Sequence, residues 1–227
     1  MSYLAIEITR RCNQECQHCM RGDAIDSDLR PSVIDRIVDV LNSAEFPDMD
    51  VLLTGGEPFL CPDIIMKLLR KCPSAYFCVV TNGTVVTPEA LVAAAEVLER
   101  YAQFDEKRDH GPIAYSNDQF HIPAHPVWKR LGVPMRNVYY DAERIVPAGR
   151  ALANGFGTLW EGVRDDNIIT ITTTGFVVLG CCYEYGKENV IGDIYECDVA
   201  AAMRQPSVAC KKSDSAKIIW EASYGNT

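Results

Sequence analysis

Three cysteines, Cys12, Cys16 and Cys19, lie close together near the start of the chain, directly after an apolar segment that is typical of a strand. Their spacing is C-x3-C-x2-C. Three thiolates on one short loop can bind three irons of a cubane iron–sulfur cluster, whereas a cluster that only stores electrons usually has four cysteine ligands. Because no fourth thiol lies nearby in the sequence, we expect the remaining iron to be open to another ligand.

A structural zinc site and disulfide bonds are the two alternatives for these cysteines. Zinc sites are usually closed tetrahedra, and only His18 stands beside the three cysteines as a fourth ligand, on a loop too short to wrap one ion easily. Disulfides fit poorly, because we find neither a secretory leader nor an apolar run long enough to span a membrane. We therefore expect a cytoplasmic protein with reduced thiols and no membrane contact.

Strand-like and helical segments alternate along the chain, which predicts crossover units and a parallel sheet. The expected strands are residues 3–9, 50–54, 75–81, 112–116, 135–140 and 168–173. The expected helices are residues 31–45, 62–71 and 87–100. A chain of 227 residues is long enough to form one large α/β domain of this kind.

The polar and glycine-rich motifs each follow one of these strands. Besides the cysteine loop, they are Gly55-Gly56-Glu57-Pro58, Thr81-Asn82-Gly83 and Ser116-Asn117-Asp118. Parallel strands end at the same rim of an α/β barrel, and active sites are built there. We therefore expect the motifs to converge, although each of the last three is also an ordinary turn sequence.

Two histidines, His121 and His125, follow the last of these motifs. Pro123 and Pro126 disfavour a helix that would place both imidazoles on one face, so we favour a surface or packing role. A histidine near a substrate can also move protons at neutral pH, and that role is the alternative.

Three motifs together point to a family. They are C-x3-C-x-aromatic-C, which ends here in His18-Cys19, then Thr54–Pro58, and Pro147–Ala151, which is similar to a Pro-x-Gly-Arg-Ala signature. The sequence thus resembles the radical S-adenosylmethionine (radical SAM) superfamily over residues 1–155. The resemblance implies a partial (β/α)6 barrel of the radical SAM type, with a short C-terminal β-hairpin appendage.

The resemblance also implies two cofactors, a [4Fe–4S] cluster and S-adenosylmethionine. Cys12, Cys16 and Cys19 would hold the cluster. The residues that it assigns to S-adenosylmethionine are Gly55, Gly56, Glu57, Pro58, Asn82, Ser116, Asp118, Gly149, Arg150 and Ala151. The two adjacent glycines would let the backbone approach the ligand, and the hydroxyl and carboxylate of the fourth-strand motif would suit its ribose.

The C-terminal part is expected to be a short extension of the same compact unit. Residues 1–155 would form the radical SAM core, and residues 156–227 the last barrel strand and the extension. Asn167–Tyr183 predicts a hairpin that turns at Thr174-Gly175, and Val190–Ile194 predicts a further strand. This outline is similar to a remnant of the SPASM or twitch extension found in larger relatives.

Such an extension would use cysteines to bind an auxiliary cluster. The late cysteines available for it are Cys181, Cys182, Cys197 and Cys210. Because free cysteines are also ordinary buried apolar residues, we prefer that role for them. The same role is expected for the earlier cysteines Cys61, Cys72 and Cys78.

A net charge of −9 argues against nucleic acid as a partner, because nonspecific binding depends on Lys and Arg. The resemblance implies an enzyme whose cluster reductively cleaves S-adenosylmethionine to methionine and a 5'-deoxyadenosyl radical. That radical would abstract hydrogen from a peptide, a protein residue or a small molecule, with peptide modification preferred by analogy. A flavodoxin or ferredoxin would supply the electron. The alternatives are an activase of a glycyl-radical enzyme and a non-catalytic iron–sulfur electron carrier or binding module.

Overall fold

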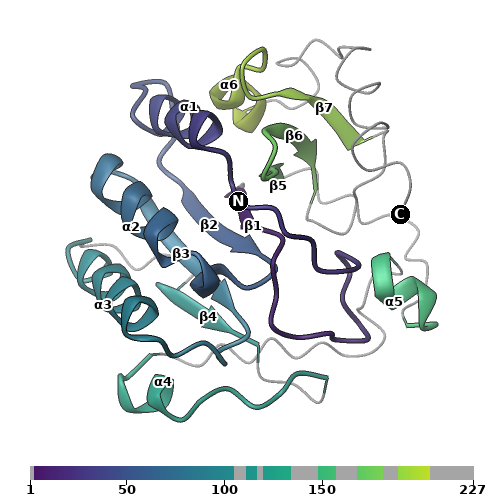
Figure 1. Ribbon diagram of the computed structural model, residues 1–227. Coiled ribbons are helices and arrows are strands. Elements are labelled where there is room, and N and C mark those ends of the chain that lie inside the picture. Colours follow the sequence, from purple (N-terminus) through teal and green to yellow (C-terminus); the bar gives the residue numbers. More distant parts are fainter. Residues whose placement is uncertain are drawn as a thin grey trace.

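The fold is built on one seven-stranded sheet, seen in a computed structural model that describes residues 3–104, 111–116, 120–133, 148–156, 168–180 and 189–204 (Figure 1). In the order β4-β3-β2-β1-β5-β6-β7, the strands do not close into a barrel within these residues. Their bounds are β1 (Tyr3–Thr9), β2 (Asp50–Gly55), β3 (Tyr76–Thr81), β4 (Ile113–Tyr115), β5 (Ile168–Ile171), β6 (Phe176–Leu179) and β7 (Val190–Asp193).

The first five strands of the sheet order from β4 to β5 run parallel, and β6 and β7 are antiparallel additions. In the centre, Leu4 of β1 lies beside Val51 on one side and Ile169 on the other. The carboxyl ends of β1, β2, β3 and β4 therefore share one rim, as the sequence predicted. The strand expected at residues 135–140 lies outside the described residues.

The three long helices of the described chain begin at proline residues. α1, α2 and α3 each have proline at the first helical position, where its missing N–H costs no helix hydrogen bond. Their bounds and those of the shorter helices are α1 (Pro31–Leu41), η1 (Pro58–Leu60), α2 (Pro62–Lys71), α3 (Pro88–Tyr101), α4 (Val127–Arg130), α5 (Gly149–Ala153) and α6 (Val199–Arg204). In the part of the chain that is described, no helix is long and apolar enough to cross a membrane.

The predicted helix ends agree with the structure at α2 and α3 but not at the end of α1. Thr87 caps α3 by accepting a hydrogen bond from the Ala90 backbone N–H, as its position before a proline suggested. α1 ends at Leu41 instead of residue 45. The Ser43 hydroxyl accepts a hydrogen bond from the Glu45 backbone N–H, and this local turn replaces the last helical turn.

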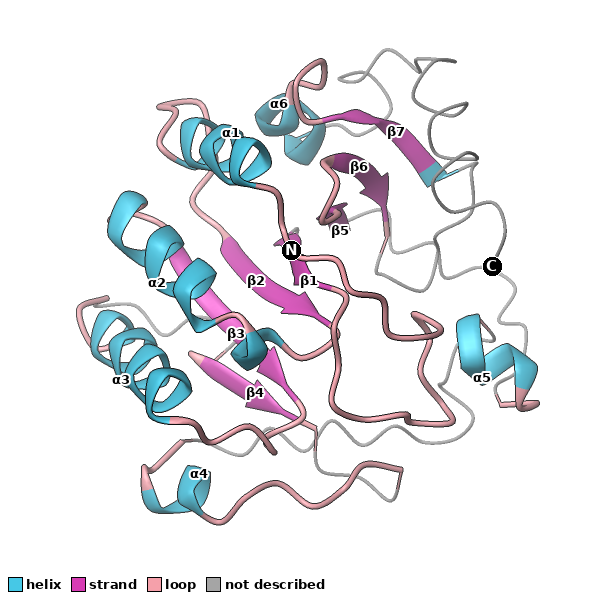
Figure 2. Ribbon diagram, viewed as in Figure 1, coloured by secondary structure: helices cyan, strands magenta, loops and turns pink. Residues whose placement is uncertain are grey.

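The two faces of the sheet have different surroundings. Leu4, Ile6 and Ile8 of β1 belong to the large core under α1, α2 and α3, which cover one face (Figure 2). The alternate residue Ala5 points the other way, where a smaller apolar cluster lies. Its buried members are Ala5, Leu52, Cys78, Ala114 and Ile168. By the same alternation Glu7 is placed on the face away from the helices.

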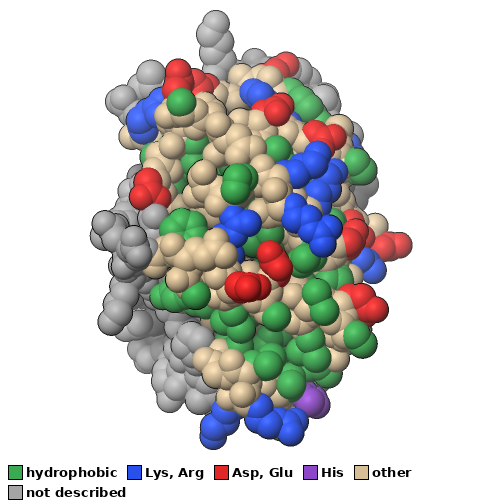
Figure 3. Space-filling view, turned by 90° about the vertical axis from the view of Figure 1, so that its left-hand side faces the viewer, with side chains coloured by type: hydrophobic (Ala, Val, Ile, Leu, Met, Phe, Trp, Pro, Cys, Tyr) green, Lys and Arg blue, Asp and Glu red, His purple; other side chains and the backbone are tan. Residues whose placement is uncertain are grey.

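The core, and not surface charge, stabilises this arrangement. Burying a Leu or Ile side chain contributes roughly 1.5–3 kcal/mol. On the helix-covered face, Lys and Arg side chains are interspersed with Asp and Glu (Figure 3). Lys67 and Lys71 of α2 both pair with Asp35 of α1, each at 3.4 Å. Exposed pairs of this kind contribute little beside the apolar core.

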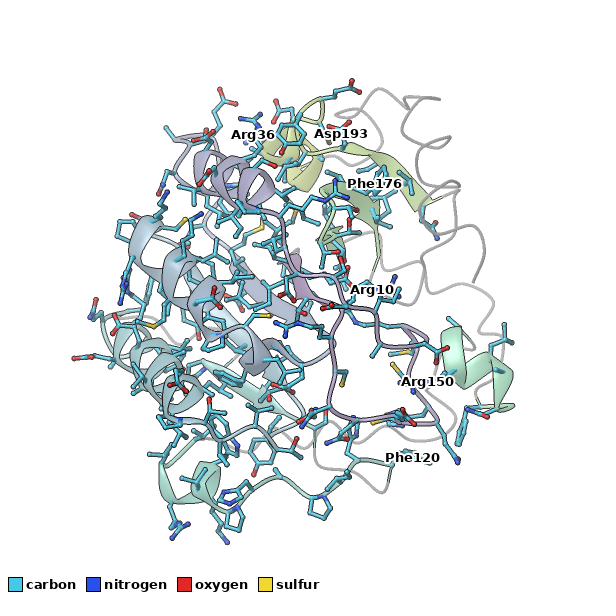
Figure 4. The ribbon with its side chains drawn as sticks, in the orientation of Figure 1. Arg10, Arg36, Phe120, Arg150, Phe176 and Asp193 are labelled. Atoms are coloured by element: carbon cyan, nitrogen blue, oxygen red, sulfur yellow. The ribbon has the colours of Figure 1, made fainter. Side chains whose placement is uncertain are left out.

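The hairpin of β5 and β6 docks under α1, and it turns at Thr174 and Gly175 as predicted. The Arg30 backbone N–H donates to the Thr173 carbonyl at 3.2 Å, and Arg36 Nε donates to the Ile194 carbonyl at 3.1 Å. Arg36 and the end of β7 lie side by side in Figure 4. The last strands are thereby joined to the helical layer as well as to the sheet.

A matched pair of glycine variants tests this docking. Gly175 and Gly132 both have positive φ, so alanine at either position costs about 1–2 kcal/mol of backbone strain. Only at Gly175 does a new Cβ also meet side chains, Val33 at 3.1 Å and Ile194 at 3.3 Å; at Gly132 no described atom lies within 4 Å. We expect Gly175→Ala to lower the free energy of unfolding more than Gly132→Ala, measured by urea denaturation. Equal losses would contradict the docking.

Candidate active site

One cavity, of about 930 Å³ including its open mouth, lies at the rim where the parallel strands end. Its wall comes from the loop after β1 and from the residues that follow β2, β3 and β4, with Arg150 of α5 on the far side. Figure 4 shows Arg10, Arg150 and Phe120 around this region. The predicted site residues that line it are Cys12, Cys16, Cys19, Gly55, Gly56, Asn82, Ser116 and Arg150.

The cysteine loop connects β1 to α1 without a helix or a strand of its own. Its three cysteines form no disulfide and are half-buried, and the Cys19 N–H donates a hydrogen bond to the Cys16 carbonyl at 3.1 Å, which closes a turn. Burial raises the pKa of the Cys12 thiol. A soft metal that binds the thiolate would offset this cost, because thiolates are the preferred ligands of iron–sulfur clusters.

An ion pair fixes the start of the cysteine loop. Arg11 donates from Nε and Nη2 to the two carboxylate oxygens of Asp28, both at 2.8 Å, and the Thr9 hydroxyl donates to Asp28 Oδ1 at 2.6 Å. Partial burial opposes the charge, but the hydrogen bonds from Arg11 and Thr9 hold the pKa of Asp28 below its ordinary value. The carboxylate therefore joins both ends of the loop at neutral pH.

Gly55 and Gly56 have a structural role that does not depend on a ligand. Gly56 N–H donates to the Thr9 carbonyl and Glu57 N–H donates to the Arg11 carbonyl, both at 2.8 Å. A Cβ atom on Gly55 would lie 2.1 Å from the Thr9 carbonyl oxygen, and one on Gly56 would lie 2.1 Å from that of Arg11. The two glycines thus let the end of β2 dock against the residues that lead into the cysteine loop, while they also line the cavity.

Glu57 is fully buried and points toward β3. Its carboxylate accepts hydrogen bonds from the Thr81 hydroxyl at 2.7 Å, the Asn82 backbone N–H at 2.7 Å and the Phe59 backbone N–H at 3.0 Å. Burial outweighs these three donors and raises the pKa of Glu57 to about 7. Glu57 therefore positions the end of β3, and the buried Pro58 that follows it starts η1.

Asn82 connects β3 to the cysteine loop. Its Nδ2 donates to Asn13 Oδ1 at 2.9 Å and lies 3.9 Å from Cys12 Sγ, while its Oδ1 accepts from Thr84. The turn that the sequence allowed is present, and the same residue also faces the cavity. Ser116 lines the cavity next to it, whereas Asp118 lies outside the described residues.

α5 supports the cysteine loop from the opposite side. Gly149 has a φ of +53°, and a Cβ atom there would lie 2.3 Å from the Gly22 nitrogen. Ala151 N–H donates to the Cys19 carbonyl at 3.2 Å. Arg150 lines the cavity, with its Nε 3.8 Å from an Asp23 carboxylate oxygen. The three predicted residues of this motif therefore lie directly against the loop.

A buried charged group at the cavity was not predicted from the sequence. Glu7 is 1% exposed, and its carboxylate pairs with Arg21 Nη1 at 2.5 Å, while Arg21 Nη2 donates to the Thr54 hydroxyl at 3.2 Å. Arg10 Nη2 donates to the Arg21 carbonyl at 3.1 Å, and both arginines line the cavity. The signal that the sequence offered was Glu7 itself, an acidic residue within a strand that is mostly apolar.

An aromatic group closes another part of the wall. The His18 ring is buried, and it lies 4.9 Å from the Phe120 ring and 4.6 Å from the His121 ring, centroid to centroid. Phe120 in turn contacts Phe156, at 5.4 Å between centroids. His121 thus packs, as the sequence favoured, but it does so at the cavity and not on a remote surface.

The remaining cysteines do not line the cavity or lie outside the described residues. Cys61, Cys72 and Cys78 are buried and form no disulfide, and Cys61 Sγ accepts a hydrogen bond from Arg11 Nη2 at 3.0 Å. Cys197 is buried as expected but disulfide-bonded, so the expectation of a free thiol is wrong at this position. The late cysteines Cys181, Cys182 and Cys210 are not described. The auxiliary cluster was the less favoured alternative for the late cysteines, and it stays untested for those that are not described.

The donor set of the loop suits the chemistry of an iron–sulfur cluster. Cys12, Cys16 and Cys19 all line the wall of one cavity, which also contains a buried amide, that of Gln14. Thiolates on separate irons are the arrangement that a cubane cluster needs.

The comparison with protein families identifies the chain. The model of the radical SAM superfamily matches residues 6–131, which include the second half of β1, the cysteine loop and β2 to β4. The chain therefore belongs to the radical SAM superfamily. Members of this family use a [4Fe–4S] cluster and S-adenosylmethionine as cofactors.

Curated relatives match part of the chain. A tungsten-containing aldehyde ferredoxin oxidoreductase cofactor-modifying protein of Pyrococcus furiosus is 34% identical over 102 residues, 43% of this chain and 28% of that protein. An AdoMet-dependent heme synthase of Nitratidesulfovibrio vulgaris is 30% identical over 128 residues, 52% of this chain and 32% of that protein. The chain thus spans less than a third of the length of these relatives.

Solved structures share the fold. BtrN in complex with AdoMet and 2-DOIA has a TM-score of 0.54 at 17% identity, covering 100% of this chain and 90% of that one. The anSMEcpe structure with bound AdoMet and the Cp18Cys peptide has a TM-score of 0.52 at 13% identity, covering 85% and 77%. These likenesses confirm the open α/β architecture.

The buried carboxyl of Glu57 gives a pH dependence that can be measured. Its pKa rises from 4.5 to about 7 on folding, so the folded protein binds this proton more tightly than the unfolded chain does. The resulting stabilisation is fully present below about pH 4.5 and is lost as the pH rises through about 7. We expect the free energy of unfolding to fall over this window in the wild type relative to Glu57→Gln, which cannot ionise. Urea titrations across the window measure it, with the exposed Glu99→Gln as the control. Parallel wild-type and Glu57→Gln curves would contradict the assignment.

Proposed function

We propose that this protein is a radical SAM enzyme in which Cys12, Cys16 and Cys19 bind a [4Fe–4S] cluster. When bound, the cluster supplies the electron that cleaves S-adenosylmethionine to methionine and a 5'-deoxyadenosyl radical, which abstracts hydrogen from the substrate. The observation that carries the proposal is the single cavity shared by the three thiols and the ends of β2, β3 and β4. An electron carrier has no need of such a cavity beside its cluster.

Different residues are proposed to contact S-adenosylmethionine and to position the residues that contact it. Backbone groups of Gly55 and Gly56 lie at the cavity wall and are proposed to receive the amino group of S-adenosylmethionine. Glu57 is assigned a positioning role, because its carboxylate holds Asn82 and not the cavity. Further proposed contacts to S-adenosylmethionine come from Pro58, Asn82, Ser116, Asp118, Gly149, Arg150 and Ala151.

The aromatic wall and the buried ion pair are proposed to exclude water from the reacting atoms. His18, Phe120 and His121 close one side, and the Glu7–Arg21 pair closes the other. Exclusion of water protects a reactive intermediate from side reactions. Residues 1–155 would form this core, and the β5–β7 segment would support it as part of one unit.

The substrate class is proposed as a peptide, a protein residue or a small molecule. Support comes from neighbours of the same fold. One is BtrN in complex with AdoMet and 2-DOIA; another is Streptococcus suis SuiB bound to its precursor peptide SuiA, with a TM-score of 0.50. A flavodoxin or ferredoxin is the proposed electron donor.

Removing one ligand tests the proposal. In anaerobically reconstituted protein, we expect Cys16→Ala to lose most of the bound iron and all formation of 5'-deoxyadenosine from S-adenosylmethionine and dithionite. Cys72→Ala is the control, because Cys72 is a buried free thiol at the end of α2 and does not line the cavity. Undiminished 5'-deoxyadenosine in Cys16→Ala would refute the ligand assignment. A wild type that binds iron and never forms 5'-deoxyadenosine would refute the enzyme.

A further inference from the structure

Gln14 has a buried donor that the described structure leaves without an acceptor. It lies between Cys12 and Cys16 in the cysteine loop, is 5% exposed, and lines the cavity. Its Oε1 accepts a hydrogen bond from Cys16 Sγ at 3.2 Å. Its Nε2 has no hydrogen-bond partner among the described residues. Because buried amide N–H groups are normally hydrogen-bonded, this donor is available to a ligand of the cavity.

Cluster binding would reverse the contact between these two side chains. As a cluster ligand, Cys16 is a thiolate, which has no proton to donate and only accepts hydrogen bonds. The Gln14 carbonyl oxygen would then face a negatively charged sulfur. A half-turn of the amide places Nε2 where Oε1 now lies and turns a repulsive contact into an N–H···S hydrogen bond.

We propose that Gln14 donates a hydrogen bond from Nε2 to the Cys16 sulfur of the bound cluster and thereby raises the reduction potential of the cluster. This inference rests on the proposed function, because it requires the cluster on Cys12, Cys16 and Cys19. Hydrogen bonds to the sulfurs are among the factors that set the potentials of iron–sulfur clusters. The added electron increases the negative charge on the sulfurs, so the bond stabilises the reduced state more than the oxidised state.

The other amides of the loop do not have this geometry. Asn13 is exposed, and its side chain is already paired with Asn82 and Thr84. Gln17 is exposed and does not line the cavity. Gln14 and Gln17 therefore form a matched pair of the same residue type on the same loop, one buried beside a predicted iron ligand and one in solvent.

Methionine substitutions of this pair test the inference, because methionine keeps the length of the side chain and removes the N–H donor. Reconstituted wild type, Gln14→Met and Gln17→Met are first compared for iron content and 5'-deoxyadenosine formation. The potential is then measured by a redox titration that follows the EPR signal of the reduced cluster. For Gln14→Met we expect an equilibrium constant for reduction about tenfold smaller, which is a shift of about 59 mV to lower potential for one electron. For Gln17→Met we expect no shift.

The outcomes separate the inference from the function on which it rests. A wild type without iron or 5'-deoxyadenosine overturns the proposed function. Normal values of both, with equal potentials in wild type and Gln14→Met, overturn the role of Gln14. If Gln14→Met fails to hold the cluster, Gln17→Met protein with ¹⁵N-labelled glutamine side chains decides the question by pulsed EPR. A ¹⁵N coupling to the reduced cluster supports the bond, and its absence overturns it.

Discussion

The candidate site depends on one backbone contact, the docking of Gly55–Glu57 at the end of β2 against Thr9–Arg11 at the end of β1. Two hydrogen bonds of 2.8 Å join the segments, and their closeness leaves no space for a side chain at either glycine. The cysteine loop has no regular structure of its own, so its path is set where it leaves this contact. The pairing of Arg11 with Asp28 then fixes the return of the chain. Any change that separates the two strand ends therefore moves the cysteines.

Hydrogen bonds and backbone packing connect the remaining walls of the cavity to this contact. Glu57 extends it to β3 by accepting hydrogen bonds from Thr81 and Asn82, and Asn82 reaches back to Asn13 in the cysteine loop. From the other side, α5 packs its first glycine against the end of the same loop. A glycine motif that looks like a ligand cradle thus has a structural reason to exist before any ligand binds. This double use explains how strand ends distant in sequence can place three cysteines at one cavity without helices or disulfides in the loop.

Apart from the strand at residues 135–140, which lies outside the described residues, sequence reasoning predicted the positions of the strands, the ends of α2 and α3, the hairpin at Thr174 and Gly175, and the rim at which the motifs meet. These features depend on local periodicity, on proline and glycine, and on the rule that parallel strands end together, all of which can be read along the chain. The direction of the Glu57 carboxylate could not be predicted, because it depends on donors from β3 that only the folded chain supplies. The Glu7–Arg21 pair was missed for the same reason. The prolines near His121 correctly predicted that His121 does not lie on a helix. Its place at the cavity depends on the tertiary contact with His18, which could not be predicted.

We propose that three thiolates of this chain hold a cluster with one iron left for S-adenosylmethionine. Mössbauer spectroscopy of protein reconstituted anaerobically with ⁵⁷Fe, before and after addition of S-adenosylmethionine, tests it most directly. About four irons per chain are expected, of which one changes its isomer shift when S-adenosylmethionine is added while the other three do not. A spectrum that S-adenosylmethionine leaves unchanged, or a chain that binds zinc in place of iron, would contradict the account.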